Sequence, residues 1–175
     1  PFFLTAAIGK RMAARGGGTV VNISTTSALM AQPEIGTYCI SKAGLNTMTR
    51  CFARELGPQG VRVNAISCGV IKTAMGDHTL NDPGRYADMM KINPLKRPGY
   101  PEEVASTALF LATEASSYST GLILQVDAAG REGGIDLARI DAGHFEARFH
   151  QKLGGEMADL AKAKHGHFPE RHGYF

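Results

Sequence analysis

Residues 19–24 are Thr19-Val20-Val21-Asn22-Ile23-Ser24, and this short run decides the fold. Its β-branched side chains favour an extended strand, and a continuous apolar run of this length indicates a strand that is buried in a sheet. A hydroxyl-rich segment, Thr25-Thr26-Ser27, follows it directly. We therefore expect a buried strand that carries polar side chains to one edge of a sheet, where they suit the mouth of a site.

Elements of two kinds alternate along most of the chain. Further apolar runs, each expected to be a strand, occupy residues 61–67 and 121–127. Four segments are expected to be helical: 2–15, 36–56, 77–92 and 101–115. Strands that alternate with helices predict an α/β fold with a parallel sheet and right-handed crossovers.

Composition limits the functional classes. The chain has 175 residues and a formal net charge of +3; residues 1–130 hold 12 basic and 9 acidic side chains, and residues 131–175 hold 7 of each. No basic stripe emerges and no apolar run is long enough to span a bilayer, so neither nucleic acid nor a membrane is an expected partner. The three cysteines form no C-x-x-C pair, which favours a reducing, cytoplasmic location: Cys39, Cys51 and Cys68.

Tyr38 and Lys42 are the candidate reactive pair. They lie in the segment Thr37-Tyr38-Cys39-Ile40-Ser41-Lys42-Ala43-Gly44-Leu45, near the start of an expected helix, and residues four apart share one helix face. A phenol, with a free pKa of about 10, is a poor acid or base at neutral pH, and a nearby ammonium stabilises its phenolate form. The pair therefore suits proton transfer to or from an oxygen.

This segment resembles the short-chain dehydrogenase/reductase family, particularly its ketoacyl-reductase-like members. Three later segments match the family in the same order: 63–73, 97–105 and 121–127. The resemblance covers residues 1–130 and implies the C-terminal catalytic half of a Rossmann-type, doubly wound parallel sheet, with about three strands and flanking helices. It also implies NAD or NADP as cofactor and a small-molecule carbonyl or alcohol as substrate.

The resemblance implies roles for individual residues. Tyr38 would be the acid/base, and Lys42 would assist it and bind the ribose of the nicotinamide. The family's hydroxyl partner lies thirteen residues before the tyrosine, which is Thr25 here although the usual residue is serine. Ser24 takes that role instead if the loop is one residue longer.

A second set of positions would contact the cofactor. By resemblance, Gly69, Ile71 and Thr73 belong to the loop that holds the nicotinamide, together with the tyrosine and lysine. Cys68 replaces the proline that usually precedes this glycine, which removes a backbone restraint. Asn64 is expected to be structural.

The first half of the family's fold is expected to be missing. Neither G-x-x-x-G-x-G nor G-x-G-x-x-G occurs in the chain, and the family's catalytic asparagine would fall before Pro1. The leading hypothesis is a half of an NAD(P)-dependent oxidoreductase, assembled as a homodimer or homotetramer as the family commonly is. The alternative is a truncated, non-enzymatic remnant or scaffold of the same fold.

Residues 131–175 form a Gly-rich and His-rich tail that matches nothing in the family. The tail holds five of the six histidines. A metal site at His165, His167 and His172 lacks supporting cysteines or carboxylates, so no metal is expected. The tail stays unassigned, with a partly helical segment expected between 136 and 164.

Overall fold

The computed structural model describes residues 1–30, 32 and 34–128. It confirms an α/β fold with a three-stranded parallel sheet in the order β1-β2-β3. The strands are β1 (Gly18–Thr25), β2 (Val61–Cys68) and β3 (Ile123–Val126). The expectations for the tail at 131–175, including its histidines, lie outside the described residues.

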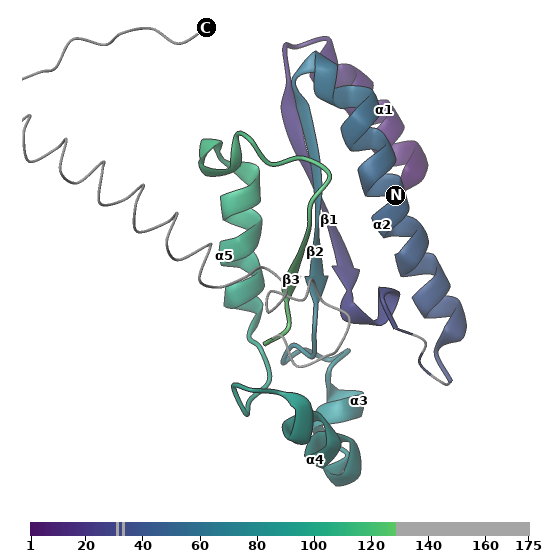
Figure 1. Ribbon diagram of the computed structural model, residues 1–175, viewed down its shortest axis with the longest axis vertical. Helices are drawn as coiled ribbons and strands as arrows, with labels where there is room; N and C mark the ends of the chain where they lie inside the picture. The colour runs from purple at the N-terminus through teal and green to yellow at the C-terminus, as the bar shows by residue number, and fades with distance from the viewer. Residues whose placement is uncertain (31, 33, 129–175) are drawn as a thin grey trace, which may run out of the picture. The chain divides into compact units, whose positions relative to one another are not determined.

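Helices cover both faces of this sheet (Figure 1). Helices α1 (Phe2–Ala13) and α2 (Gly36–Leu56) lie on one face, and α5 (Pro101–Ala112) lies on the other. Three 3-10 turns complete the connections: η1 (Thr26–Ala28), η2 (Gly57–Gln59) and η3 (Glu114–Ser116). No helix in the described part of the chain is long and apolar enough to cross a membrane.

The single helix expected at 77–92 is wrong, because two helices occupy this segment. They are α3 (Asp77–Leu80) and α4 (Pro83–Ile92), which lie beyond the carboxyl ends of the strands in Figure 1. Pro83 has no N–H to continue the first helix, and it suits the first turn of a new one. Asp82 caps α4 by accepting a hydrogen bond of 3.0 Å from the backbone N–H of Arg85.

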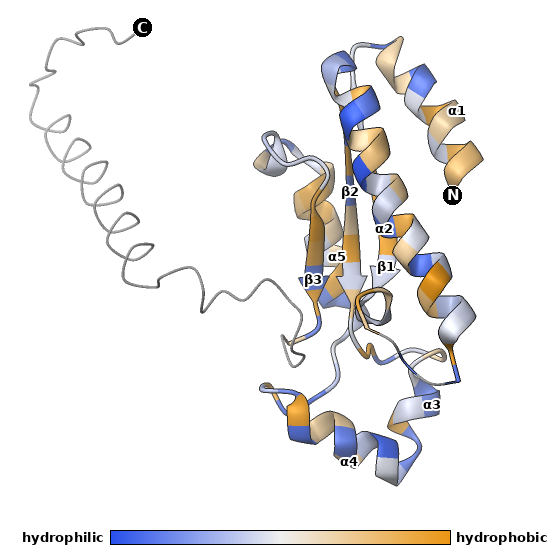
Figure 2. Ribbon diagram, turned by 45° about the vertical axis from the view of Figure 1, so that its right-hand side comes forward, coloured by the Kyte–Doolittle hydropathy of each residue, from blue (hydrophilic) through white to orange (hydrophobic). Residues whose placement is uncertain are grey.

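The core lies between β2 and α2. Val61 and Val63 of β2 are fully buried and pack against Phe52 and Leu56 of the helix; Figure 2 shows the hydrophobic residues of the strands between the helices. The expectation that the first strand is buried holds only in part. Strand β1 lies at an edge of the described sheet, and 49% of Ile23 is exposed.

Side chains alternate between the two faces of β1. The Asn22 amide donates to Thr49 Oγ1 of α2 at 3.0 Å, whereas Thr19 Oγ1 donates to the Leu111 carbonyl of α5 at 3.2 Å. Even-numbered residues of β1 therefore face α2. Parallel register aligns Ser24 with Ser67 of β2, so both side chains lie on the face that α2 covers.

Candidate active site

Tyr38 and Lys42 lie in the first turns of α2, beside the carboxyl end of β1. The Lys42 ammonium is 5.8 Å from the centroid of the Tyr38 ring, within the range of a cation–π contact. It also donates a hydrogen bond of 2.8 Å to the backbone carbonyl of Ile23. The structure thus brings the tyrosine–lysine pair to the end of β1, through a backbone acceptor that the sequence pattern could not identify.

The direction of α2 explains this placement. The helix begins at Gly36, after the connection that follows β1, and its other end packs through Phe52 and Leu56 onto the start of β2. It therefore runs opposite to the strands, as a crossover between parallel strands does. Its first turns come to lie at the edge of the sheet where β1 ends.

Thr25 and Ser24 differ in their surroundings. Thr25 is the last residue of β1, and its Oγ1 accepts a hydrogen bond of 3.3 Å from the backbone N–H of Ser27. Ser24 faces α2, is buried, and its Oγ has no hydrogen-bond partner among the described residues. Thr25 therefore keeps an oriented hydroxyl whose proton is free for donation, at the point where the strand enters the loop.

Gly69 to Thr73 form a loop that leaves the carboxyl end of β2. The Gly69 N–H donates to the Val126 carbonyl at 3.0 Å, and a Cβ at this glycine would come within 2.6 Å of the Asp127 Cβ. The loop then folds on itself, because Thr73 Oγ1 donates to the Ile71 carbonyl at 3.3 Å. Gly69 is thus required for the close approach of the loop to the end of β3.

Residues 97–103 form a clamp that holds this loop. The sequence pattern included this segment but indicated no role for it. Ile71 pairs with Gly99 in an isolated parallel bridge. Next to it, Arg97 binds Glu103 through two contacts of 2.9 and 2.7 Å, and the Tyr100 N–H donates to the same carboxylate at 2.8 Å. These donors lower the pKa of Glu103 to about 2. The segment therefore ties the loop to the start of α5.

Cys68 lies next to Thr25, with which it is in register. Burial raises the pKa of its thiol, and the positive charge of Lys42 opposes that shift. All three cysteines of the chain are free. The residue that replaces the usual proline thus lies within electrostatic reach of the tyrosine–lysine pair.

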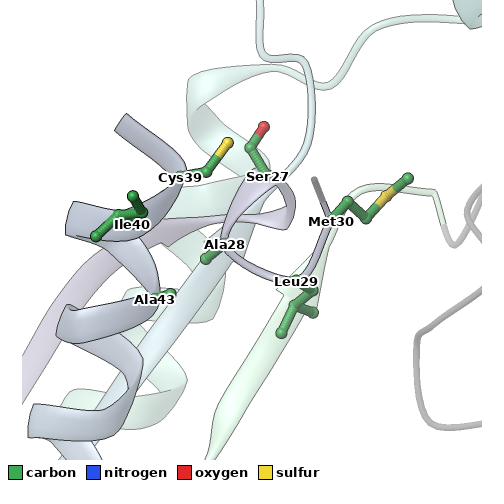
Figure 3. A pocket seen from close by; sticks show the side chains of 7 residues that line it. All are labelled: Ser27, Ala28, Leu29, Met30, Cys39, Ile40 and Ala43. Atoms are coloured by element: carbon green, nitrogen blue, oxygen red, sulfur yellow. The ribbon is translucent and has the colours of Figure 1, made fainter. Parts of the chain in front are cut away.

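A pocket of about 280 Å³ lies between η1 and the start of α2. Figure 3 shows Cys39, Ile40 and Ala43 of the helix on one side and the η1 segment on the other. The lining residues are Ser27, Ala28, Leu29, Met30, Cys39, Ile40 and Ala43. Neither the tyrosine nor the lysine lines it, so this pocket adjoins the candidate active site without containing its reactive groups.

Asn64 lies outside the reactive set. The Asn64 amide donates to the Ser119 carbonyl at 2.9 Å and accepts from the Leu122 N–H at 3.0 Å, which gives it the structural role that was expected. No group of three or more His, Cys, Asp or Glu side chains that could hold a metal ion occurs within residues 1–30, 32 and 34–128.

Comparison with known proteins places this geometry among oxidoreductases. A family model described as enoyl-(acyl carrier protein) reductase matches residues 1–130. The NAD-dependent glycerol dehydrogenase of Listeria innocua is 42% identical over 127 residues, which cover 72% of this chain and 49% of the relative. A 3-oxoacyl-[acyl-carrier-protein] reductase of Thermotoga maritima is 38% identical over 126 residues, covering 72% of this chain and 50% of the relative.

Solved structures of dehydrogenases are also similar to this chain. A 7α-hydroxysteroid dehydrogenase complexed with NADH and 7-oxo glycochenodeoxycholic acid matches with a TM-score of 0.70 and 32% identity, over 76% of this chain and 52% of that one. A gluconate 5-dehydrogenase from Burkholderia cenocepacia, in complex with NADP and tartrate, matches with a TM-score of 0.70 and 27% identity, over 73% and 50%. The chain spans about half the length of these relatives.

Proposed function

Because the chain belongs to the short-chain dehydrogenase/reductase family, we propose that residues 1–130 are the catalytic half of an NAD(P)-dependent oxidoreductase. It interconverts a carbonyl and an alcohol of a small molecule by hydride transfer. Residues 131–175 are a separate segment to which we assign no role.

One observation carries the proposal: the Lys42 ammonium lies over the Tyr38 ring and is fixed by the Ile23 carbonyl. A phenol held beside a fixed ammonium suits proton exchange with the oxygen of a bound substrate. Tyr38 then gives its proton to a carbonyl oxygen in reduction, or takes one from an alcohol in oxidation.

Thr25 is the proposed hydroxyl partner, and the surroundings of the two candidate hydroxyls support this choice over Ser24. Since the Ser27 N–H occupies one lone pair of Thr25 Oγ1, the hydroxyl proton is left for a substrate oxygen. Ser24 Oγ, in contrast, is buried on the face of the sheet under α2. A donor at the end of β1 would stabilise charge that develops on the substrate oxygen.

The residues present fit the nicotinamide end of a dinucleotide. Gly69 lets the loop that leaves β2 pass against Asp127, and the clamp at Gly99 fixes the Ile71 backbone. Ile71 and Thr73 would then hold the nicotinamide end, and Lys42 would hold its ribose. When bound, the nicotinamide supplies or accepts the hydride; the glycine-rich turn for its phosphates does not occur in this sequence.

Self-association as a homodimer or homotetramer is part of the proposal. Large apolar side chains are exposed on the outer helices: Phe3 and Leu4 on α1, Ile40 on α2 and Leu109 on α5. A surface of this kind is typical of an interface between subunits. Sedimentation of the protein would show more than one chain per particle, and a monomer would contradict this part.

The test of the reaction needs a nucleotide-binding half, which a chimera with the first half of the Listeria innocua relative supplies. Tyr38→Phe should reduce turnover by roughly 10²–10⁴-fold, the contribution of a positioned acid/base, with cofactor affinity nearly unchanged. Tyr118→Phe is the matched control, because Tyr118 is fully exposed and should keep its turnover. Full turnover in Tyr38→Phe would show that another acid does the work.

The alternative is a non-enzymatic remnant or scaffold of the same fold. It is favoured by the half-length coverage of the relatives and by the position of β1 at an edge of the described sheet. Nicotinamide fluorescence and protection from unfolding separate the two readings. An effect of NADH or NADPH supports the oxidoreductase, whereas no effect of either at millimolar concentration supports the remnant.

A further inference from the structure

Four buried polar atoms lie close to the tyrosine–lysine pair without any hydrogen-bond partner among the described residues. They are the hydroxyls of Ser24 and Ser67 and both the Oδ1 and the Nδ2 of Asn46. The three residues are 3%, 0% and 3% exposed. Since buried polar groups in folded proteins almost always bond to protein or to ordered water, these atoms require a common explanation.

Ser24 and Ser67 lie side by side. They are partners in the parallel pairing of β1 and β2, and neighbouring strands are about 4.8 Å apart. Both side chains face α2, because Asn22 on the same side of β1 bonds Thr49 of that helix. The two hydroxyls therefore form one polar row beneath α2, near the carboxyl end of the sheet.

Asn46 faces the same row from the helix. It lies between Lys42, which bonds the Ile23 carbonyl, and Thr49, which bonds Asn22, so its level along β1 is that of residues 22–24. Helical spacing places all three side chains on one face of α2. The amide is thus enclosed between the helix and the ends of the two strands.

A second estimate of the position of Asn46 along the strands agrees with the first. Ala53 of α2 lies beside Gly121, whose N–H bonds the Val63 carbonyl of β2. Asn46 is two helical turns from Ala53, or about 10.5 Å along the axis. That rise equals about three residues of a strand, which leads from Val63 to the level of Ile66, the neighbour of Ser67.

We propose that Ser24, Asn46 and Ser67 form a binding site for one internal water molecule between β1, β2 and α2. The set offers two hydroxyls, an amide donor and an amide acceptor, so its ligand must both donate and accept hydrogen bonds. A buried water makes about three such bonds. No charged side chain belongs to the set, so a neutral ligand follows.

The site completes a polar ladder along the inner face of α2. Thr49 is bonded to Asn22, Lys42 is bonded to the backbone of β1, and the water joins Asn46 between them to both strands. Each rung fixes one turn of the helix to the sheet. The water is therefore a structural ligand that lies one helical turn from the lysine of the reactive pair.

Oxygen-17 magnetic relaxation dispersion tests the site by counting long-lived internal waters in the protein. Asn46→Leu keeps the size of the side chain and removes both amide groups, so it should lower the count by one water per chain. Asn81→Leu is the matched control, because Asn81 is exposed between α3 and α4 and its loss should change nothing. Ser67→Ala replaces Asn46→Leu as the test variant if the latter fails to fold.

A high-resolution crystal structure gives an independent readout. Density for one water within 2.7–3.2 Å of at least three of the four atoms, the ordinary range of a hydrogen bond, supports the site. Direct bonds between the three side chains, or another part of the chain bonded to them, would overturn it, as would an unchanged water count in Asn46→Leu. Turnover is not measured, so either outcome leaves the proposed function to its own test.

Discussion

Replacing Thr25 by valine isolates the hydroxyl that we assign to substrate binding. The change keeps the β-branched shape and volume, so no cavity forms. Among the described residues, this side chain has one hydrogen-bond partner, the Ser27 N–H, at 3.3 Å. This is long for an N–H···O bond, and its loss should cost about 0.5 kcal/mol of stability.

The expected effect of Thr25→Val on turnover is much larger than its effect on stability. Removing one donor to a developing oxyanion typically lowers kcat by roughly 10²–10³-fold, or about 3–4 kcal/mol. A gap between the two energies of this size means that misfolding cannot explain a loss of activity. Steady-state kinetics and thermal unfolding of the same protein, with its nucleotide-binding half present, measure both.

Neighbouring hydroxyls give the controls for Thr25→Val. Thr26→Val removes an equally buried hydroxyl that donates to the Cys68 carbonyl at 3.5 Å, and this variant should keep its turnover. Thr25→Ser restores the hydroxyl and should restore the rate. The reasoning is refuted if Thr25→Val turns over normally while Ser24→Ala loses the reaction, because the partner would then be Ser24.

Two further predictions concern the loop after β2 and its clamp. Gly69→Ala should weaken cofactor binding about fivefold or more, since relieving a contact of 2.6 Å with Asp127 takes about 1–3 kcal/mol. In Gly44→Ala, where nothing lies within 4 Å, cofactor binding should stay unchanged. Glu103 has a pKa of about 2 instead of 4.5, so its stabilising charge is present above pH 4.5 and is lost as the pH falls through about 2. The melting temperature of Glu103→Gln should therefore depend less on pH in this interval than that of the unsubstituted protein. Equal acid sensitivity of the two proteins would show that the ion pair between Glu103 and Arg97 does not stabilise the fold.

Much of the fold could be predicted from the sequence because most elements are marked by local sequence signals. The helix expected at 36–56 is found as Gly36–Leu56, since its apolar spacing and the glycine–proline pair that follows it are both local signals. The prediction of a single helix at 77–92 was wrong because Asp82 and Pro83 fit a helix start better than a helix interior. The exposure of Ile23 could not be predicted, since it depends on which strands flank β1.

In the candidate site too, local spacing predicted some features and left others open. Spacing along one helix was enough to put Tyr38 and Lys42 together, and the structure confirms that they are neighbours. The acceptor at Ile23 is a backbone carbonyl, which no residue pattern can reveal. The choice between Thr25 and Ser24 depends on which way each side chain points, and a one-residue shift along a strand reverses that direction.

The hydrogen bond to Ile23 is compatible with both of the roles that we propose for Lys42. An ammonium has three N–H donors, and the bond of 2.8 Å to the Ile23 carbonyl uses one of them. That bond fixes the nitrogen near the Tyr38 ring. The two remaining donors suit a pair of ribose hydroxyls, and a bound ribose would hold the ammonium more firmly without displacing it. In the function that we propose, Lys42 would therefore stay beside Tyr38 while it binds the cofactor, because the edge of β1 and not the ligand sets its position.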